Sequence, residues 1–198
     1  MNRRSAIGVG LVLAASRALL RPGHAFAQGG WTTLFDGSHA NNFEPIGTAN
    51  WRLTEGGILQ ADVGNGFLVS KNDYADFQLR VEFWVDATAN SGVFSRCTDP
   101  KRVTTMSAYE VNIFDTRPDP TYGTGAIVNV AKVSPMPKAG NQWNVYDITA
   151  KGQEFTVVLN GITTVEGARD GKFSKGRIAL QYGAGIVRFR KVEIRVFA

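Results

Sequence analysis

The sequence is a succession of short runs in which apolar and polar residues alternate, and no segment keeps a helical period. In the clearest run Phe77, Leu79, Val81 and Phe83 alternate with polar residues, as in a strand with one buried face. Gly, Asn, Asp and Pro separate the runs and predict frequent turns. Roughly a dozen strands with such turns predict an all-β fold, a two-sheet antiparallel sandwich. The other expected strands lie at 51–54, 58–61, 67–70, 143–149, 155–159, 162–165, 177–181 and 187–196.

Two details of this pattern predict local geometry. Asn160-Gly161 separates two of the runs and predicts a tight hairpin turn, because both residue types accept positive φ. Within 187–196 the apolar residues change parity at Arg190-Lys191, which predicts a bulge or a bend in one long strand. Two long loops, Thr98–Ser107 and Thr116–Met136, interrupt the strands, and such loops commonly border a binding site.

Residues 1–27 differ in character from the rest of the chain. Arg3 and Arg4 precede an apolar run too short for a permanent membrane span, and Ala25-Phe26-Ala27 then forms a small-x-small cleavage site. We therefore predict a cleaved export signal at 1–27, one domain at 28–198, and a periplasmic or secreted bacterial protein. The paired arginines suit the twin-arginine route, and an ordinary secretory signal is the alternative.

Removal of this segment changes the charge of the chain and the classes of function it allows. The segment carries four arginines and no acid, so the formal charge falls from +5 to +1. No basic run interleaved with aromatic residues remains, so we expect no nucleic-acid partner. Cys97 and His39 are then the only cysteine and histidine, which excludes Cys/His zinc sites. No acidic loop typical of calcium sites is visible, so we expect no metal and no cofactor.

Two of the expected strands carry polar and charged side chains where a core strand would carry apolar ones. They are 90–96 and 109–115. Alternate side chains of a strand share a face, so Glu110 and Asn112 point the same way. With Arg96 on the neighbouring strand, a carboxylate and a guanidinium would share one sheet surface, which suits a polar ligand. An incidental ion pair on a solvated face is the alternative.

A series of short motifs resembles a known family in content and in order. The motifs are Leu34-Phe35-Asp36-Gly37, Gly56-Gly57-Ile58-Leu59, Asp76-Phe77-Gln78-Leu79, Asn90-Ser91-Gly92-Val93-Phe94, Tyr109-Glu110, Gly123-Thr124-Gly125, Trp143-Asn144, Leu159-Asn160-Gly161, Gly176-Arg177-Ile178 and Val187-Arg188-Phe189-Arg190. Together they resemble the 3-keto-disaccharide hydrolase domain over nearly the whole mature chain. The resemblance implies a concanavalin A-like jelly-roll sandwich of the lectin and glucanase type. It also implies a small carbohydrate or glycoside ligand, and hydrolase action on glycosides whose sugar carries a ketone at C3.

The chain departs from the resemblance at two informative positions. Members of the family commonly carry Gln where this chain has Asn112, and a His-Gly pair where it has Tyr182-Gly183. These differences keep a second function open, a non-catalytic carbohydrate-binding or interaction domain of the same fold.

A ketone at C3 acidifies the proton on C2, so a glycosidic bond can break by elimination followed by hydration. This route needs a base, a group that stabilises the enolate, and a proton for the leaving oxygen. We expect Glu110 to be the base and Arg96 the enolate stabiliser, with Asp115 or a water supplying the proton. A loop-capping role for Asp115 is the alternative. A retaining glycosidase that pairs Glu110 with Asp115 is a weaker one, because the two residues have opposite parity.

Five further side chains are expected to bind the substrate: Asn90, Asn112, Trp143, Asn144 and Gln181. The amides would bind sugar hydroxyls, and the indole of Trp143 would stack on a sugar ring. Burial in the core of the sandwich is the alternative for this tryptophan. Turn formation at the entry to a strand is the alternative for Asn90.

Overall fold

The computed structural model describes residues 30–38 and 40–197, so the predicted export signal lies outside the described residues. Within these residues the chain forms thirteen β-strands and three short 3-10 helices. The 3-10 helices are η1 (Ala40–Asn42), η2 (Glu55–Gly57) and η3 (Pro120–Tyr122). None of the helices formed by the described residues has the length and apolar character needed to cross a membrane.

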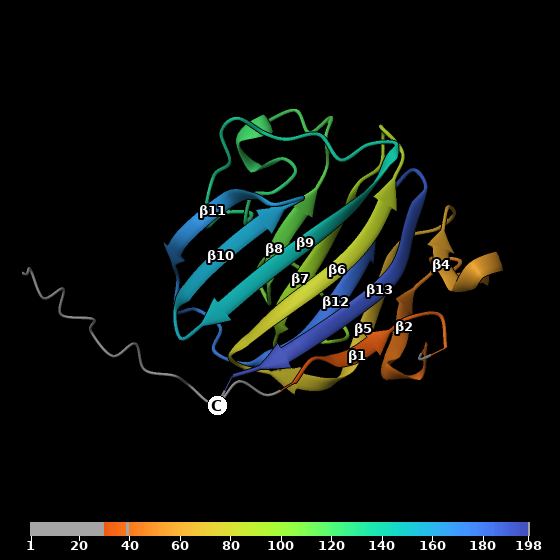
Figure 1. The fold of residues 1–198 in the computed structure, drawn as a ribbon, viewed down its shortest axis with the longest axis horizontal. Helices are drawn as coiled ribbons and strands as arrows, with labels where there is room; N and C mark the ends of the chain where they lie inside the picture. Colours follow the sequence, from red (N-terminus) through yellow and green to blue (C-terminus); the bar gives the residue numbers. More distant parts are fainter. Residues whose placement is uncertain (1–29, 39, 198) are drawn as a thin grey trace, which may run out of the picture.

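The strands form two sheets that pack face to face (Figure 1). The larger sheet has the order β11-β10-β9-β6-β13-β4-β3, with β1 beside β13, and the smaller has the order β2-β5-β12-β7-β8. The strands of the larger sheet are β1 (Thr32–Phe35), β3 (Arg52–Thr54), β4 (Ile58–Ala61), β6 (Phe77–Val85), β9 (Gln142–Lys151), β10 (Glu154–Leu159), β11 (Ile162–Arg169) and β13 (Val187–Val196). Those of the smaller sheet are β2 (Phe43–Gly47), β5 (Gly66–Tyr74), β7 (Ser91–Cys97), β8 (Tyr109–Ile113) and β12 (Gly176–Tyr182).

The pairings between these strands are antiparallel, and several join segments far apart in the chain. The C-terminal strand β13 lies between β6 and β4, and β12 lies between β5 and β7. The predicted two-sheet antiparallel jelly-roll sandwich is therefore confirmed.

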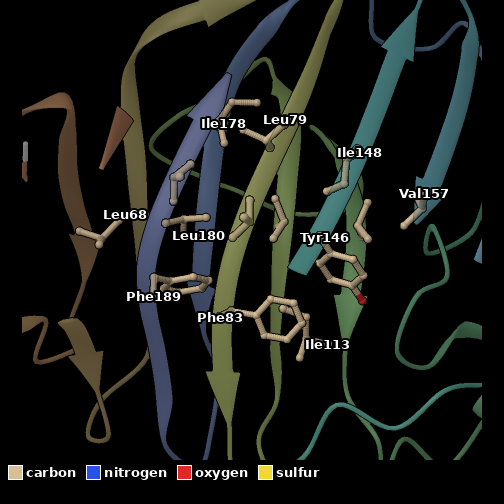
Figure 2. Packing of buried hydrophobic residues seen from close by; sticks show 14 of the residues in the cluster. Leu68, Leu79, Phe83, Ile113, Tyr146, Ile148, Val157, Ile178, Leu180 and Phe189 are labelled. Carbon is tan, nitrogen blue, oxygen red and sulfur yellow. The ribbon is translucent and has the colours of Figure 1, made fainter. Parts of the chain in front are cut away.

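The core lies between the two sheets. The alternating residues of β6 that the sequence assigns to the core, Phe77, Leu79, Val81 and Phe83, are all 0% exposed. Figure 2 shows side chains from both sheets meeting in this layer, including Phe83 from the larger sheet and Leu180 from the smaller. Each fully buried side chain of this size contributes about 1.5–3 kcal/mol, so the alternation itself specifies which face of each sheet points inward.

Both local predictions from the strand pattern are confirmed. Asn160 and Gly161 have φ of 52° and 81° and join β10 to β11 as a hairpin. In β13, Phe189 pairs with Phe83 and Lys191 with Glu82, so Arg190 is the extra residue of a bulge.

A second, smaller apolar cluster lies on the outer face of the smaller sheet. Val69, Phe94 and Ala179 come from three neighbouring strands and pack against Val103 and Ala108. Val103 belongs to the predicted loop 98–107 and Ala108 follows it. This loop therefore covers the part of the outer face that Val69, Phe94 and Ala179 form.

The edge strands of both sheets are irregular, short or covered. β11 has two register shifts against β10, β3 has three residues, and β2 contains Pro45. The outer edge of β8 is bonded to a loop, because the amide of Asn112 donates to the carbonyl of Ala126, and the amide of Val128 donates to the carbonyl of Glu110.

Candidate functional site

The polar residues predicted for the site meet on the outer face of the smaller sheet. Phe94 pairs with Glu110 and Gly92 with Asn112, so Glu110 and Asn112 occupy successive outward positions of β8. Leu180 pairs with Val93, which places Gln181 of β12 beside Gly92. Gln181, Gly92 and Asn112 thus form one row across three strands, and Glu110 lies in the next row.

Glu110 is a carboxyl group in an unusual environment. The residue is 9% exposed, and its side chain makes no hydrogen bond or ion pair with any other described residue. Burial raises its pKa to about 7, and the positive charge of Arg117 opposes that shift. A carboxyl group that titrates near neutral pH can both remove and return a proton, as acid–base catalysis requires.

Gly92 makes room for this carboxyl group. A Cβ atom at residue 92 would lie 3.0 Å from Oε1 of Glu110 and 3.3 Å from Oε1 of Gln181. The absence of a side chain therefore lets the Glu110 carboxyl group and the Gln181 amide oxygen approach the same point from neighbouring strands.

Two amide oxygens in this row are buried without a hydrogen-bond donor. They are Oε1 of Gln181 and Oδ1 of Asn112. The nitrogen of the Asn112 amide does have a partner, because it donates to the carbonyl of Tyr122 over 2.6 Å. Buried polar atoms are normally bonded, so two unpaired acceptors beside an unpaired carboxyl group indicate a functional site.

Asn90 lies one position further along the same face. Its backbone pairs with Ala184, and its side-chain amide packs against Gly183. The structure therefore brings together four of the predicted site residues: Asn90, Glu110, Asn112 and Gln181. Their roles in binding and catalysis stay predictions.

The prediction that Arg96 shares a surface with Glu110 is wrong. Arg96 is 0% exposed, and its φ of 50° turns the chain at the end of β7, so the strand alternation does not extend to it. Its guanidinium donates to the carbonyls of Ala75, Gly152 and Phe173 and to the carboxylate of Asp76, over 2.7–3.1 Å. It also lies 5.1 Å from the centre of the Phe155 ring, at one end of the inter-sheet core. Arg96 therefore joins three backbone segments inside the sandwich.

Asp115 does not reach the outer face either, and its loop-capping alternative agrees with the structure. Its carboxylate accepts hydrogen bonds from the amides of Ala139 and Gly140, at 2.9 Å each, and from the hydroxyl of Thr124 at 2.6 Å. These bonds join the start of the loop 116–136 to Thr124 within it and to the segment before β9. The carboxylate therefore anchors the chain on either side of this loop, and its predicted role in catalysis stays a prediction.

Asn144 and Trp143 lie on the other sheet and away from Glu110. Asn144 is 1% exposed, and its amide nitrogen donates to the carbonyls of Ala139 and Gln142. Trp143 faces the opposite side of β9 and is half-buried, and the guanidinium of Arg190 lies 4.3 Å from the centre of its ring. The prediction that these two residues join Glu110 in one site is therefore wrong.

Arg117 is the residue near Glu110 that the sequence did not indicate. It follows β8 by four residues, and its amide donates to the carbonyl of Phe114, so the chain turns back there. Its guanidinium has no ion pair or hydrogen bond among the described residues, yet its charge acts on Glu110. The signal in the sequence was only its place in a long loop directly after the strand that carries Glu110.

Other parts of the structure add little to this site. A cavity of about 140 Å³ opens on the same outer face nearer to β2, where Ile46, Val69, Pro100 and Arg177 line it. The described residues contain no group of three or more His, Cys, Asp and Glu side chains that could hold a metal ion.

The two antiparallel sheets define the fold class of the protein, the jelly-roll β-sandwiches. Within that class, the family model of the 3-keto-alpha-glucoside-1,2-lyase-like domain matches residues 30–195, so the chain belongs to that family. No protein of curated function matches the sequence.

Solved structures support the same class. A candidate glycosyl hydrolase from Parabacteroides distasonis is 25% identical, with a TM-score of 0.70 over 85% of this chain and 100% of that one. A carbohydrate-binding module from Bacillus subtilis, CBM66, is 18% identical, with a TM-score of 0.57 over 84% and 95% of the two chains. A β-glucanase from Bacillus licheniformis is 13% identical, with a TM-score of 0.56 over 83% and 91%. The last two show the fold alone.

Proposed function

We propose that the protein cleaves the glycosidic bond of 3-keto-glycosides by elimination and hydration, with Glu110 as the base. The observation that carries the proposal is an unpaired carboxyl group, 9% exposed, whose pKa is raised to about 7 by burial on the outer face of the smaller sheet. Membership of the 3-keto-alpha-glucoside-1,2-lyase-like family supports the choice of substrate class.

The proposed reaction has two stages. Glu110 takes the proton from C2, and the electrons of that C–H bond form an enolate with the C3 ketone. The enolate then expels the C1 oxygen, which leaves as an alcohol after it gains a proton, and a C1–C2 double bond remains. Water then adds to C1 and gives its proton to the hydroxide left where another water protonated the leaving oxygen, and Glu110 returns its own proton to C2.

The enolate stabiliser must be a different residue from the one predicted by the sequence. Arg96 is committed to backbone carbonyls inside the sandwich, whereas the Arg117 guanidinium has no hydrogen bond or ion pair among the described residues and its charge acts on Glu110. We assign the enolate to Arg117, because a cation near developing negative charge lowers the barrier. Since Asp115 is fully bonded, a water supplies the proton to the leaving oxygen in this scheme.

The test is to incubate the purified protein with 3-keto-glycosides and with the parent glycosides, and to follow release of the leaving group. We expect cleavage of the keto forms alone. The substitution Glu110→Gln should lower turnover by at least ~100-fold if this side chain is the base. Glu166→Gln, on exposed strand β11, is the matched control and should leave turnover unchanged. Near-normal turnover of Glu110→Gln would reject the assignment.

A second function, carbohydrate binding without cleavage, is favoured by one specific observation. Of the three side chains predicted to be catalytic, Arg96 and Asp115 are structural, and only Glu110 lies on the polar outer face. Binding of keto and parent glycosides with no release of product would support this function in place of the enzyme.

We also propose that residues 1–27 direct export from the cytoplasm. The support is their composition alone, a pair of arginines, an apolar run and a small-x-small site. Recovery of a periplasmic or secreted form that begins at Gln28 would support export, and a cytoplasmic protein that retains Met1–Ala27 would contradict it.

A further inference from the structure

Two oxygen atoms with no donor lie near Gly92, one from each of the strands that flank β7. Oε1 of Gln181 is buried and unpaired, and the Glu110 carboxyl group has no hydrogen-bond partner among the described residues. A Cβ atom at residue 92 would lie 3.0 Å from Oε1 of Glu110 and 3.3 Å from Oε1 of Gln181, so both oxygens border the space that a side chain there would fill. A carboxylate beside an amide oxygen is an unfavourable pair, because both are acceptors.

A proton on Glu110 removes this conflict. A protonated carboxyl group is a hydrogen-bond donor, and the Gln181 oxygen is the buried acceptor nearby that lacks one. Because Gly92 has no side chain, nothing from β7 stands between the two groups. The Asn112 amide is not that donor in the structure, since the one hydrogen bond that its nitrogen makes with the described residues goes to the carbonyl of Tyr122.

We propose that, in the empty site near neutral pH, Glu110 is protonated and donates its proton to Oε1 of Gln181, which makes Gln181 the positioning residue for this proton. The pairing is a property of the empty site, while its consequence for turnover rests on the proposed function. A sugar hydroxyl that donates to Oε1 of Gln181 competes with Glu110 for this acceptor. The protonated form then loses its acceptor, the proton leaves to water, and Glu110 becomes a base only when substrate is bound.

The charges around Glu110 are consistent with this arrangement. On the neighbouring strands, Gly92 and Phe94 of β7 and Gln181 of β12 are neutral, and so is Asn112 on its own strand. Arg117, from the loop after β8, is the charged group that acts on Glu110, and it favours the ionised form. Burial and the Gln181 oxygen favour the protonated form and oppose Arg117.

The experiment is an infrared or carbon NMR titration of the Glu110 carboxyl group, with its signal assigned by its loss in Glu110→Gln. The comparison is between the parent protein and Gln181→Met, which keeps the volume and removes the acceptor. We expect the apparent pKa of Glu110 to fall by about one unit in Gln181→Met, which makes the ratio of protonated to ionised Glu110 roughly tenfold smaller. If burial alone set the pKa of Glu110, the apolar Met would leave that pKa unchanged or raise it. Either result would overturn the proposal. Gln78→Met on the larger sheet is the matched control and should leave this titration unchanged.

A second variant keeps the test decisive if Gln181→Met does not fold. Gly92→Ala inserts a methyl group 3.0 Å from the Glu110 oxygen and 3.3 Å from the Gln181 oxygen, and it should lower the pKa of Glu110 in the same direction. An unchanged titration in Gly92→Ala would also contradict the pairing. The two proposals can fail separately: a shifted titration without cleavage of keto-glycosides refutes the enzyme only, and cleavage without a shifted titration refutes the pairing only.

Discussion

Replacement of Arg96 by alanine distinguishes a structural guanidinium from a catalytic one. In the structure, Arg96 donates four hydrogen bonds, three of them to the backbone carbonyls of Ala75, Gly152 and Phe173. Its side chain is 1% exposed, so water cannot take its place without a rearrangement, whereas its partner Asp76 is 38% exposed and stays hydrated. The substitution therefore leaves unpaired acceptors and a void rather than an unpaired buried carboxylate.

The expected cost follows from those bonds. An acceptor left without its donor costs about 1–3 kcal/mol, and three carbonyls lose theirs, so about 3–5 kcal/mol follows because such contributions do not add fully. We expect Arg96→Ala to lower the free energy of unfolding by about 3–5 kcal/mol. At about 2–4 °C per kcal/mol, Tm should fall by on the order of 10 °C.

The assay is urea unfolding followed by circular dichroism, together with cleavage or binding measured well below the transition. The matched control is Arg169→Ala, because Arg169 pairs with Glu154 on the surface with side-chain exposures of 68% and 56%. That variant should lose less than about 1 kcal/mol. If Arg96→Ala unfolds within about 1 kcal/mol of the parent and yet loses all cleavage, the structural reasoning is refuted and the original catalytic assignment is restored.

Three further predictions concern pH and single side chains. Folding raises the pKa of Glu110 from 4.5 to about 7, so its contribution to stability is full below pH 4.5 and is lost as pH rises through about 7. The Glu110→Gln variant should not show this loss, so at about pH 8 its free energy of unfolding should be higher than that of the parent by on the order of 2 kcal/mol. The measurement is the urea midpoint of both proteins at about pH 5 and pH 8. Equal pH profiles for the two proteins would contradict it. Asp115→Ala should cost about 2 kcal/mol and speed proteolysis within 116–138, because the amides of Ala139 and Gly140 lose their carboxylate acceptor. An unchanged cleavage pattern argues against this anchor. Trp143→Phe should leave sugar binding within about twofold of the parent in calorimetry, because Trp143 lies on the other sheet under Arg190, and a large loss of affinity would reinstate it as a ligand residue.

Most of the fold was predictable because burial follows alternation. The strand at 58–61, the hairpin at Asn160-Gly161 and the bulge at Arg190 all came from period-two patterns and turn chemistry, which are local properties. The same alternation placed Glu110 and Asn112 on one face. It also contained evidence against Asn144, which shares its parity with Tyr146 and Ile148 and therefore points inward.

The errors at the site arise where local patterns end. The φ of 50° at Arg96 turns its side chain inward, and neither Gly nor Asn marks the position, so the residue type gives no warning. Asp115 and Arg117 follow the last residue of β8, where alternation no longer applies, and their places depend on contacts with residues far along the chain or on how the loop folds back. The role of Gly92 depends on which side chains meet on either side of it, which only the pairing of three strands reveals.

The irregular borders of the two sheets have a consequence for how the molecule behaves at high concentration. Long, regular borders recruit strands from other molecules, which is the first step toward fibrils and exchanged dimers. Here a proline on β2, a three-residue β3, shifted register along β11 and a loop bonded to β8 each interrupt such recruitment by a different means. A protein built this way can stay dispersed in a crowded compartment without relying on net charge, which is close to zero once residues 1–27 are excluded.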